Sequence, residues 1–180
     1  MAWKGDHTWD MNTRDLTAVL PALLAELVHG STDPSANTSM LNRGDQGLLA
    51  SLDKISASAA STARAGGATI AAHVDHLRYG LSLLNRWASG EEAPWINSDW
   101  TASWQKSQVT SGEWQELRHE LRREADRWLS ALREPRELRD RELAWTIGSV
   151  AHLAYHMGAI RQIDRTTRGP TAEDEARLGG

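Results

Sequence analysis

The chain contains no cysteine and no phenylalanine, and only two of its 180 residues are tyrosine. The absence of cysteine excludes disulfide bonds, thiolate nucleophiles, iron–sulfur clusters and zinc sites with cysteine ligands. It fits a reducing compartment, and because no signal-like segment is visible we expect a cytoplasmic protein. No apolar run approaches the roughly 20 residues that a membrane-spanning helix needs, so we expect no membrane partner.

The sequence also lacks an excess of positive charge. It has 20 Lys and Arg against 24 Asp and Glu, which gives a net charge of −4. Proteins dedicated to nucleic acids usually carry an obvious basic surface. In residues 113–127, arginine and glutamate alternate in a way that is typical of a solvated helix face with ion pairs. We therefore expect no nucleic-acid partner.

Tryptophan, in contrast, is abundant, with nine residues. Trp95, Trp100 and Trp104 lie in the segment 90–110, which has no helical periodicity. An indole is a large apolar group with one N–H that needs a partner. These rings can anchor the segment by burial, form a platform for a ligand or make an exposed interface patch, and the sequence leaves the three roles open.

Apolar residues elsewhere repeat at spacings of three and four, and no segment alternates as a strand does. The repeats predict helices over about 16–29, 45–55, 70–87, 111–133 and 139–165. Thr69 is a predicted N-cap, Asp45 could cap the second helix, and Thr110 with Glu113 forms a capping box. Pro21 predicts a kink or a helix start inside the first segment.

These elements predict an all-α protein, an up-and-down four-helix bundle with extra helical and loop segments near the N-terminus. We expect residues 1–165 to form one domain and residues 166–180 to form a polar, flexible C-terminal tail.

Two close histidine pairs are the most informative feature. His152 and His156 are four residues apart on the last predicted helix, on the face that also carries Ile160. On the helix that begins at residue 70, His73 lies inside the apolar stripe, about 40° from Leu77, and His76 lies about 100° off, nearer its boundary, at ~100° per residue. The sequence therefore favours His73 as the inward-facing histidine of that helix.

A single histidine on an apolar face is usually a hydrogen-bonded core residue. Three buried imidazoles without partners would cost about 1–3 kcal/mol each, and one shared metal ion would remove that cost. We therefore predict that His73, His152 and His156 bind one divalent transition metal, Zn²⁺ or Ni²⁺, with His76 as the reserve ligand. Three protein ligands leave the fourth position open to water or substrate.

The two histidine segments together resemble the DinB/YfiT-like superfamily. Residues 71–78 read AAHVDHLR and residues 152–162 read HLAYHMGAIRQ, in the expected order, and the resemblance spans about residues 10–165. It implies a four-helix bundle with a three-histidine metal site, formed by motif position from His73, His152 and His156. Members include transferases and isomerases that use thiols such as bacillithiol or mycothiol, and homodimers are frequent. Many members carry His-Arg-Gly-Gln at the second histidine, where this chain has Met157-Gly158 after His156.

Two functions compete. The first is a metal-dependent enzyme of the thiol S-transferase or hydrolase type with a small-molecule substrate, for which Tyr155, Arg161 and Gln162 are the candidate catalytic residues. Position 153 is Leu, so the Glu of a His-Glu-x-x-His protease motif is missing. The alternative is a non-catalytic bundle, a stress-related or partner-binding module whose metal site is structural or vestigial.

The resemblance also favours a homodimer. The first predicted helix adds to this expectation because it carries more apolar residues than a small bundle needs. These residues are Leu16, Val19, Leu20, Leu23 and Leu27.

Overall fold

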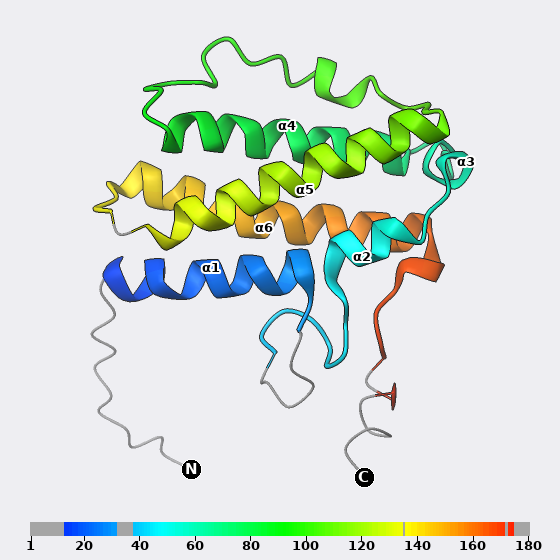
Figure 1. Cartoon of the computed structure of the whole chain (residues 1–180), viewed down its shortest axis with the longest axis horizontal. Coiled ribbons are helices and arrows are strands. Elements are labelled where there is room, and N and C mark those ends of the chain that lie inside the picture. Colours follow the sequence, from blue (N-terminus) through cyan, green and yellow to red (C-terminus); the bar gives the residue numbers. More distant parts are fainter. Residues whose placement is uncertain (1–12, 32–37, 135, 172, 175–180) are drawn as a thin grey trace, which may run out of the picture.

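The computed structural model describes residues 13–31, 38–134, 136–171 and 173–174. Within these ranges all regular structure is helical, which confirms the all-α prediction. Four long helices lie side by side (Figure 1): α1 (Thr13–His29), α4 (Ile70–Ala88), α5 (Ser111–Arg133) and α6 (Asp140–Ile163). The short elements are α2 (Gly47–Asp53), α3 (Ala57–Ala60) and two 3₁₀ turns, η1 (Ala102–Trp104) and η2 (Arg165–Thr167). In the described part of the chain, no helix combines the length and the apolar character needed to cross a membrane.

The helices α4 and α5 run in the same direction. At their starts, Thr69 Oγ1 donates to Ser107 O at 3.1 Å, and further along Asn85 Nδ2 donates to Glu124 O at 2.9 Å. The connection 89–110 therefore returns along the whole length of α4 before α5 begins (Figure 1). The order of directions is up–down–down–up, which differs from the simple up-and-down order expected from the sequence, because one long crossover replaces a short turn.

Local signals in the sequence fix where the long helices begin. Thr69 Oγ1 accepts a hydrogen bond from Ala72 N, and Thr110 with Glu113 forms the predicted capping box. The helix α1 continues through Pro21. The second helix begins one residue later than an Asp45 cap would place it, at Gly47 with Gln46 as N-cap.

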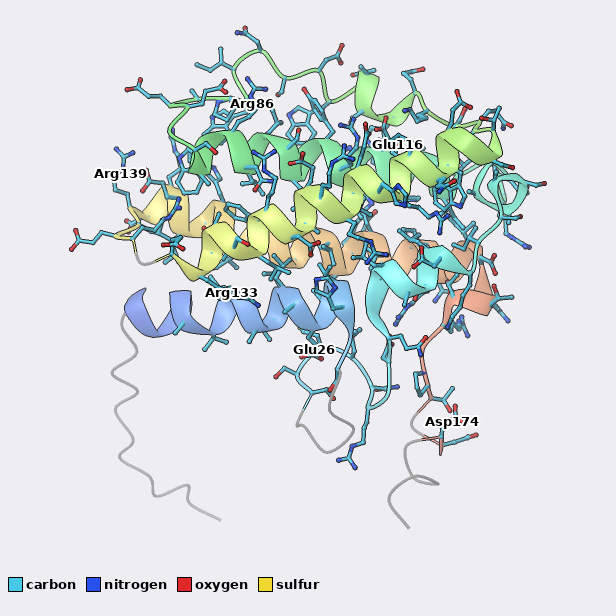
Figure 2. All side chains as sticks on the ribbon, in the orientation of Figure 1. Glu26, Arg86, Glu116, Arg133, Arg139 and Asp174 are labelled. Atoms are coloured by element: carbon cyan, nitrogen blue, oxygen red, sulfur yellow. The ribbon has the colours of Figure 1, made fainter. Side chains whose placement is uncertain are left out.

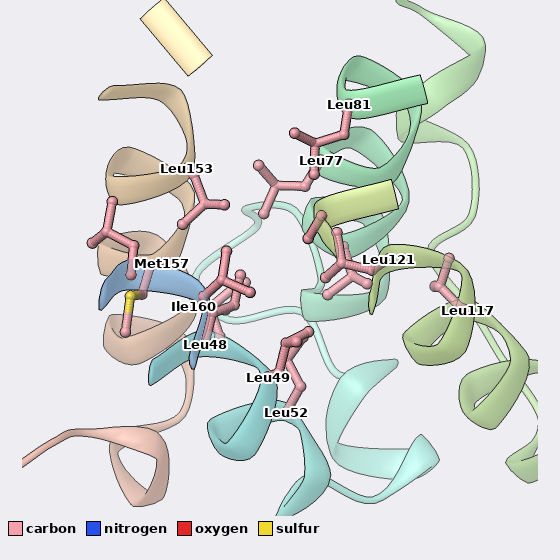
Figure 3. Close-up of a cluster of buried hydrophobic side chains, with 14 of the residues drawn as sticks. Leu48, Leu49, Leu52, Leu77, Leu81, Leu117, Leu121, Leu153, Met157 and Ile160 are labelled. Atoms are coloured by element: carbon pink, nitrogen blue, oxygen red, sulfur yellow. The ribbon is translucent and has the colours of Figure 1, made fainter. Parts of the chain in front are cut away.

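The core is formed by apolar side chains from every long helix and from α2, which closes one end of the bundle (Figure 3). On α1, Leu20, Leu24 and Leu27 all point into this core. The outer surfaces are charged, as Figure 2 shows for Arg86, Glu116 and Arg139. The bundle therefore has a largely apolar interior in which a buried polar side chain needs a specific partner.

The loops at the α2 end are tied down by polar contacts. The Glu26 carboxylate, at the loop end of α1 in Figure 2, accepts hydrogen bonds from the backbone N–H groups of residues 39–41. Asn42 Nδ2 donates to Pro170 O at 2.7 Å, and Thr167 is buried. The first residues of the segment predicted as a tail, up to Pro170, thus pack against the bundle.

Candidate metal centre

Histidines from α4 and α6 meet inside the bundle. The Nε2 atom of His152 lies 3.1 Å from Nε2 of His76 and 2.9 Å from Nε2 of His156. One ring nitrogen from each of the three lies within 4.8 Å of the other two, which is the spacing of a metal site. We call these three residues the three-His cluster.

His73 occupies a different position from the one expected. Its Nδ1 lies 2.8 Å from Nδ1 of His156, so it contacts the ring nitrogen that the cluster does not use. The predicted reserve ligand, His76, points its Nε2 into the cluster. The predicted ligand, His73, lies behind His156, outside the cluster. The physical reason is that residues 70–77 are buried on every side, because the crossover covers their outer face. When every side of a helical segment is buried, its apolar residues do not indicate which side faces the bundle interior.

Ser103 of η1 sets the tautomer of His76. The Ser103 hydroxyl donates to Trp100 O at 2.7 Å, so toward His76 it can only accept. The His76 Nδ1, 2.8 Å away, must then be the donor. In the neutral ring this leaves Nε2 without a proton and with its lone pair directed at the cluster.

His73 can do the same for His156. The two Nδ1 atoms form one hydrogen bond, and when His156 donates, its Nε2 is left bare. Ligating histidines commonly donate their second N–H to an acceptor that fixes the ring, most often a carboxylate or a carbonyl. Here a neutral imidazole fills that role.

Burial keeps these rings uncharged. Burial is the largest cause, and together with the neighbouring histidines it lowers the pKa of His76 to about 4, against a raising effect of Asp75, and the pKa of His156 to about 3. Burial also lowers the pKa values of His73 and His152. When none of the three Nε2 atoms carries a proton, their lone pairs repel one another at 2.9–3.1 Å, and a cation between them removes that repulsion. Two imidazole nitrogens on a tetrahedral ion, at bonds of about 2.0–2.1 Å, lie about 3.3 Å apart, so the cluster fits a divalent metal.

The helical fold agrees with a comparison of the sequence against protein families. A family model described as the DinB superfamily matches residues 40–160. This chain belongs to the DinB superfamily. The match includes the crossover and all four histidines of the site. Searches of curated proteins and of solved structures found no match.

In this DinB-superfamily chain, aromatic rings from the crossover pack against the three-His cluster. Trp104 stacks on His76 with ring centroids 4.3 Å apart and meets His73 edge-on at 5.2 Å. Trp100 lies 5.5 Å from His76 on its other flank. The Trp-rich composition of the segment signalled its importance, but nothing in the sequence related Ser103 or Trp104 to a histidine of α4.

The three candidate catalytic residues lie at different distances from the metal centre of this DinB bundle. The ring of Tyr155 is 70% exposed and meets His156 edge-on at 5.1 Å. Arg161 instead forms a 2.8 Å ion pair with buried Asp45. Gln162 is exposed and accepts a hydrogen bond from Arg168. Of the three, Tyr155 is the one whose ring contacts the cluster.

Proposed function

We propose that this chain is a metal-dependent enzyme that holds one divalent transition metal, Zn²⁺ or Ni²⁺, on His76, His152 and His156. The observation that carries the proposal is the convergence of three imidazole Nε2 atoms from two helices. All-imidazole donor sets suit both metals, and the chain has no cysteine to compete. Three protein ligands leave room for water or a substrate, as in catalytic zinc sites.

The proposed reaction is thiol transfer or hydrolysis on a small molecule, with a low-molecular-weight thiol as one substrate, in the cytoplasm. A divalent ion bound at the cluster would lower the pKa of a bound thiol or water and polarise the substrate. Such chemistry asks little of the surrounding side chains, which agrees with Leu153 at the place of a protease-type general base. Ser103 and His73 would orient the ligand rings, and Tyr155 is the nearest candidate for a proton donor.

One observation favours the alternative, a non-catalytic bundle with a structural metal. Arg161 and Gln162 are both engaged in contacts outside the cluster. An enzyme assay with the metal-loaded protein separates the two functions. We expect turnover of a thiol with an electrophile, or of an activated ester, that is lost in His152→Ala. Full metal occupancy without either reaction would support the structural role.

Metal analysis tests the ligand set directly. The protein is purified without a metal-affinity column, given Zn²⁺ or Ni²⁺ at neutral pH and dialysed. We expect one equivalent in the wild type and less than about one tenth in His76→Ala, His152→Ala and His156→Ala. His29→Ala is the matched control, because His29 pairs with Asp126 outside the cluster.

His73→Ala distinguishes this ligand set from the one expected from the sequence. It should retain stoichiometric metal with affinity lowered about 10–100-fold, the usual effect of losing a residue that orients a ligand. Loss of the metal in His73→Ala together with full retention in His76→Ala would show that the third ligand is His73 and not His76. A wild type that binds neither ion would contradict the proposed function.

A further inference from the structure

Solvent reaches the three-His cluster at His152. This residue is half-buried, whereas His76 and His156 are only 7% and 2% exposed. Beside it, α4 carries Gly80 instead of a side chain. A methyl group at Gly80 would lie 3.7 Å from Cζ3 of Trp100 and 3.8 Å from Cε1 of His152. The six-membered ring of Trp100 therefore stands next to the one cluster histidine that is open to solvent.

Trp100 is held in this place although it is 43% exposed. Its ring meets Tyr79 edge-on at 5.5 Å, and the Tyr79 hydroxyl accepts a hydrogen bond from Asp99 N at 2.9 Å. Its carbonyl accepts the hydroxyl of Ser103. The indole therefore packs against Tyr79 and His76 while the Ser103 hydrogen bond holds its backbone, and its exposed part is an apolar surface in water.

The other solvent-facing ring at the cluster is the phenol of Tyr155, which meets the His156 ring edge-on. The charged residues closest in sequence to His76 are directed elsewhere. Asp75 is buried and pairs with Arg78, and Arg78 also reaches Glu120 of α5. The two exposed side chains that meet the cluster rings, Trp100 and Tyr155, are both aromatic, and aromatic surfaces favour apolar and planar groups.

We propose that Trp100 is a specificity-determining residue that selects substrates with an uncharged ring directly next to the group that binds the metal. The inference rests on the proposed function, because it needs an ion at the cluster to hold the reacting group. The substrate ring packs on the open face of the indole while the reacting group reaches the ion near His152. A substrate with an anionic group at the far end of its ring gains nothing from this surface.

The test uses the full chain loaded with Co²⁺, whose visible absorption reports ligands that bind the ion. The probes are acetohydroxamate, benzohydroxamate and 4-carboxybenzohydroxamate, which share one metal-binding group. In the wild type, benzohydroxamate should bind at least about tenfold more tightly than acetohydroxamate, or about 1.4 kcal/mol. The carboxylated probe should bind more weakly than benzohydroxamate.

In Trp100→Ala, the affinity for acetohydroxamate should stay within about twofold of the wild type, while the preference for benzohydroxamate falls to about twofold. Trp100→Phe should keep most of the preference. Trp100→Lys should favour the carboxylated probe. The matched control is Trp95→Ala, which removes an indole of the same crossover that packs on Trp145 instead, and should leave the preference intact.

An unchanged preference in Trp100→Ala overturns the inference while leaving the metal site in place. Tighter wild-type binding of the carboxylated probe than of benzohydroxamate also overturns it, because a cation would then border the site. Failure of the wild type to bind Co²⁺ overturns the proposed function and the inference together, and the absence of the cobalt spectrum identifies that case.

Discussion

Ser103 controls which nitrogen of His76 carries the proton. It lies on η1, outside the two helices that carry the cluster. Its hydroxyl accepts from His76 Nδ1 because its own hydrogen is given to Trp100 O. Metal binding needs the lone pair on Nε2, so the preference of the ring for one tautomer contributes to affinity.

We expect Ser103→Ala to lower metal affinity about 10–100-fold without changing the stoichiometry. Without the acceptor, the His76 ring can place its proton on Nε2 or rotate. Competition with a chelator of known affinity measures the change. The control is Ser98→Ala, which removes a hydroxyl of the same crossover that donates to Trp95 O. Equal chelator competition in both variants would show that the hydrogen bond does not orient the ligand.

The metal-free protein should lose stability as the pH falls through the histidine range. The pKa values of His76 and His156 are about 4 and about 3 in the folded state, against about 6.5 in an unfolded chain. Between these values the unfolded chain binds more protons, so the free energy of unfolding rises with pH. Stability is therefore full above pH 6.5 and decreases as the pH falls from there toward 3.

Denaturant midpoints of the metal-free protein at pH 7.5 and pH 5.5 measure this change, since most carboxyl groups stay ionised over that interval. The control is the double variant His76→Gln, His156→Gln, whose midpoint should fall less. A wild-type midpoint that rises at pH 5.5 would mean that the buried rings accept protons more readily than an exposed histidine does.

Some of the site could be read from the sequence and some could not. His152 and His156 were found because two residues four apart on one helix must share a face whatever surrounds them. The choice between His73 and His76 required knowing what covers α4, and that cover is the crossover, which has no periodic pattern. The Ser103 contact depends entirely on how this irregular segment folds back.

At the scale of elements, the ion pair between Arg161 and Asp45 joins the last turn of α6 to the loop before α2. Asp45 is 2% exposed, and its carboxylate accepts hydrogen bonds from Arg161 and from Gly47 N. Gly169 leaves the space that this carboxylate fills, because a side chain there would overlap it. Arg161, which the sequence suggested as a catalytic residue, therefore forms a structural ion pair in this fold.

Arg161→Ala should lower the free energy of unfolding by about 3 kcal/mol, because it leaves the Asp45 carboxylate buried without its cation. The variant pair Arg161→Met, Asp45→Asn should lose less than the sum of the single variants. Urea unfolding measures each change, and Arg168→Ala, an exposed arginine in the next segment, should stay within about 0.5 kcal/mol. Lost turnover with unchanged stability in Arg161→Ala would instead favour a catalytic role.

The sequence predicted helix starts well and helix directions poorly. Thr69 and Thr110 are local signals, since each hydroxyl accepts a hydrogen bond from a backbone N–H three residues further along the chain. The parallel arrangement of α4 and α5 depends on where residues 89–110 lead the chain. The length of that segment was visible from its lack of periodicity, but its path was not.

At the scale of the whole molecule, α6 has no charged residue between Glu142 and Arg161. Its inner side carries the cluster, yet its outer side is also apolar, with Ile147, Ala151 and Gly158 exposed. A helix that is apolar all round is usually covered all round. Of the apolar residues of α1 that suggested a dimer, Leu20 and Leu27 are buried in the core and Val19 is exposed, whereas this face of α6 is left uncovered by the residues that the structure describes.

We therefore expect the homodimer predicted from the resemblance to form through α6, with a second copy of this chain on that face. Ile147→Glu should shift the protein to monomer in sedimentation at micromolar concentration, because the dimer would bury the new charge. Val19→Glu, at an exposed apolar position of α1, should leave the dimer intact. A monomeric wild type, or dissociation by Val19→Glu alone, would contradict this interface.

The crossover also affects how the chain folds. Joining α4 to α5 through residues 89–110, instead of through a turn of about four residues, costs about 1.5 kcal/mol of extra loop-closure entropy by the logarithmic length law. Contacts between α4 and α5 stabilise the fold only after the long loop has closed, so the pairing of these helices is a late, non-local event for a helical protein. Trp95 and Trp104 pack onto other elements and shorten the free length of the loop. Trp104, which stacks on His76 of the cluster, therefore also lowers the entropic cost of pairing α4 with α5 in parallel.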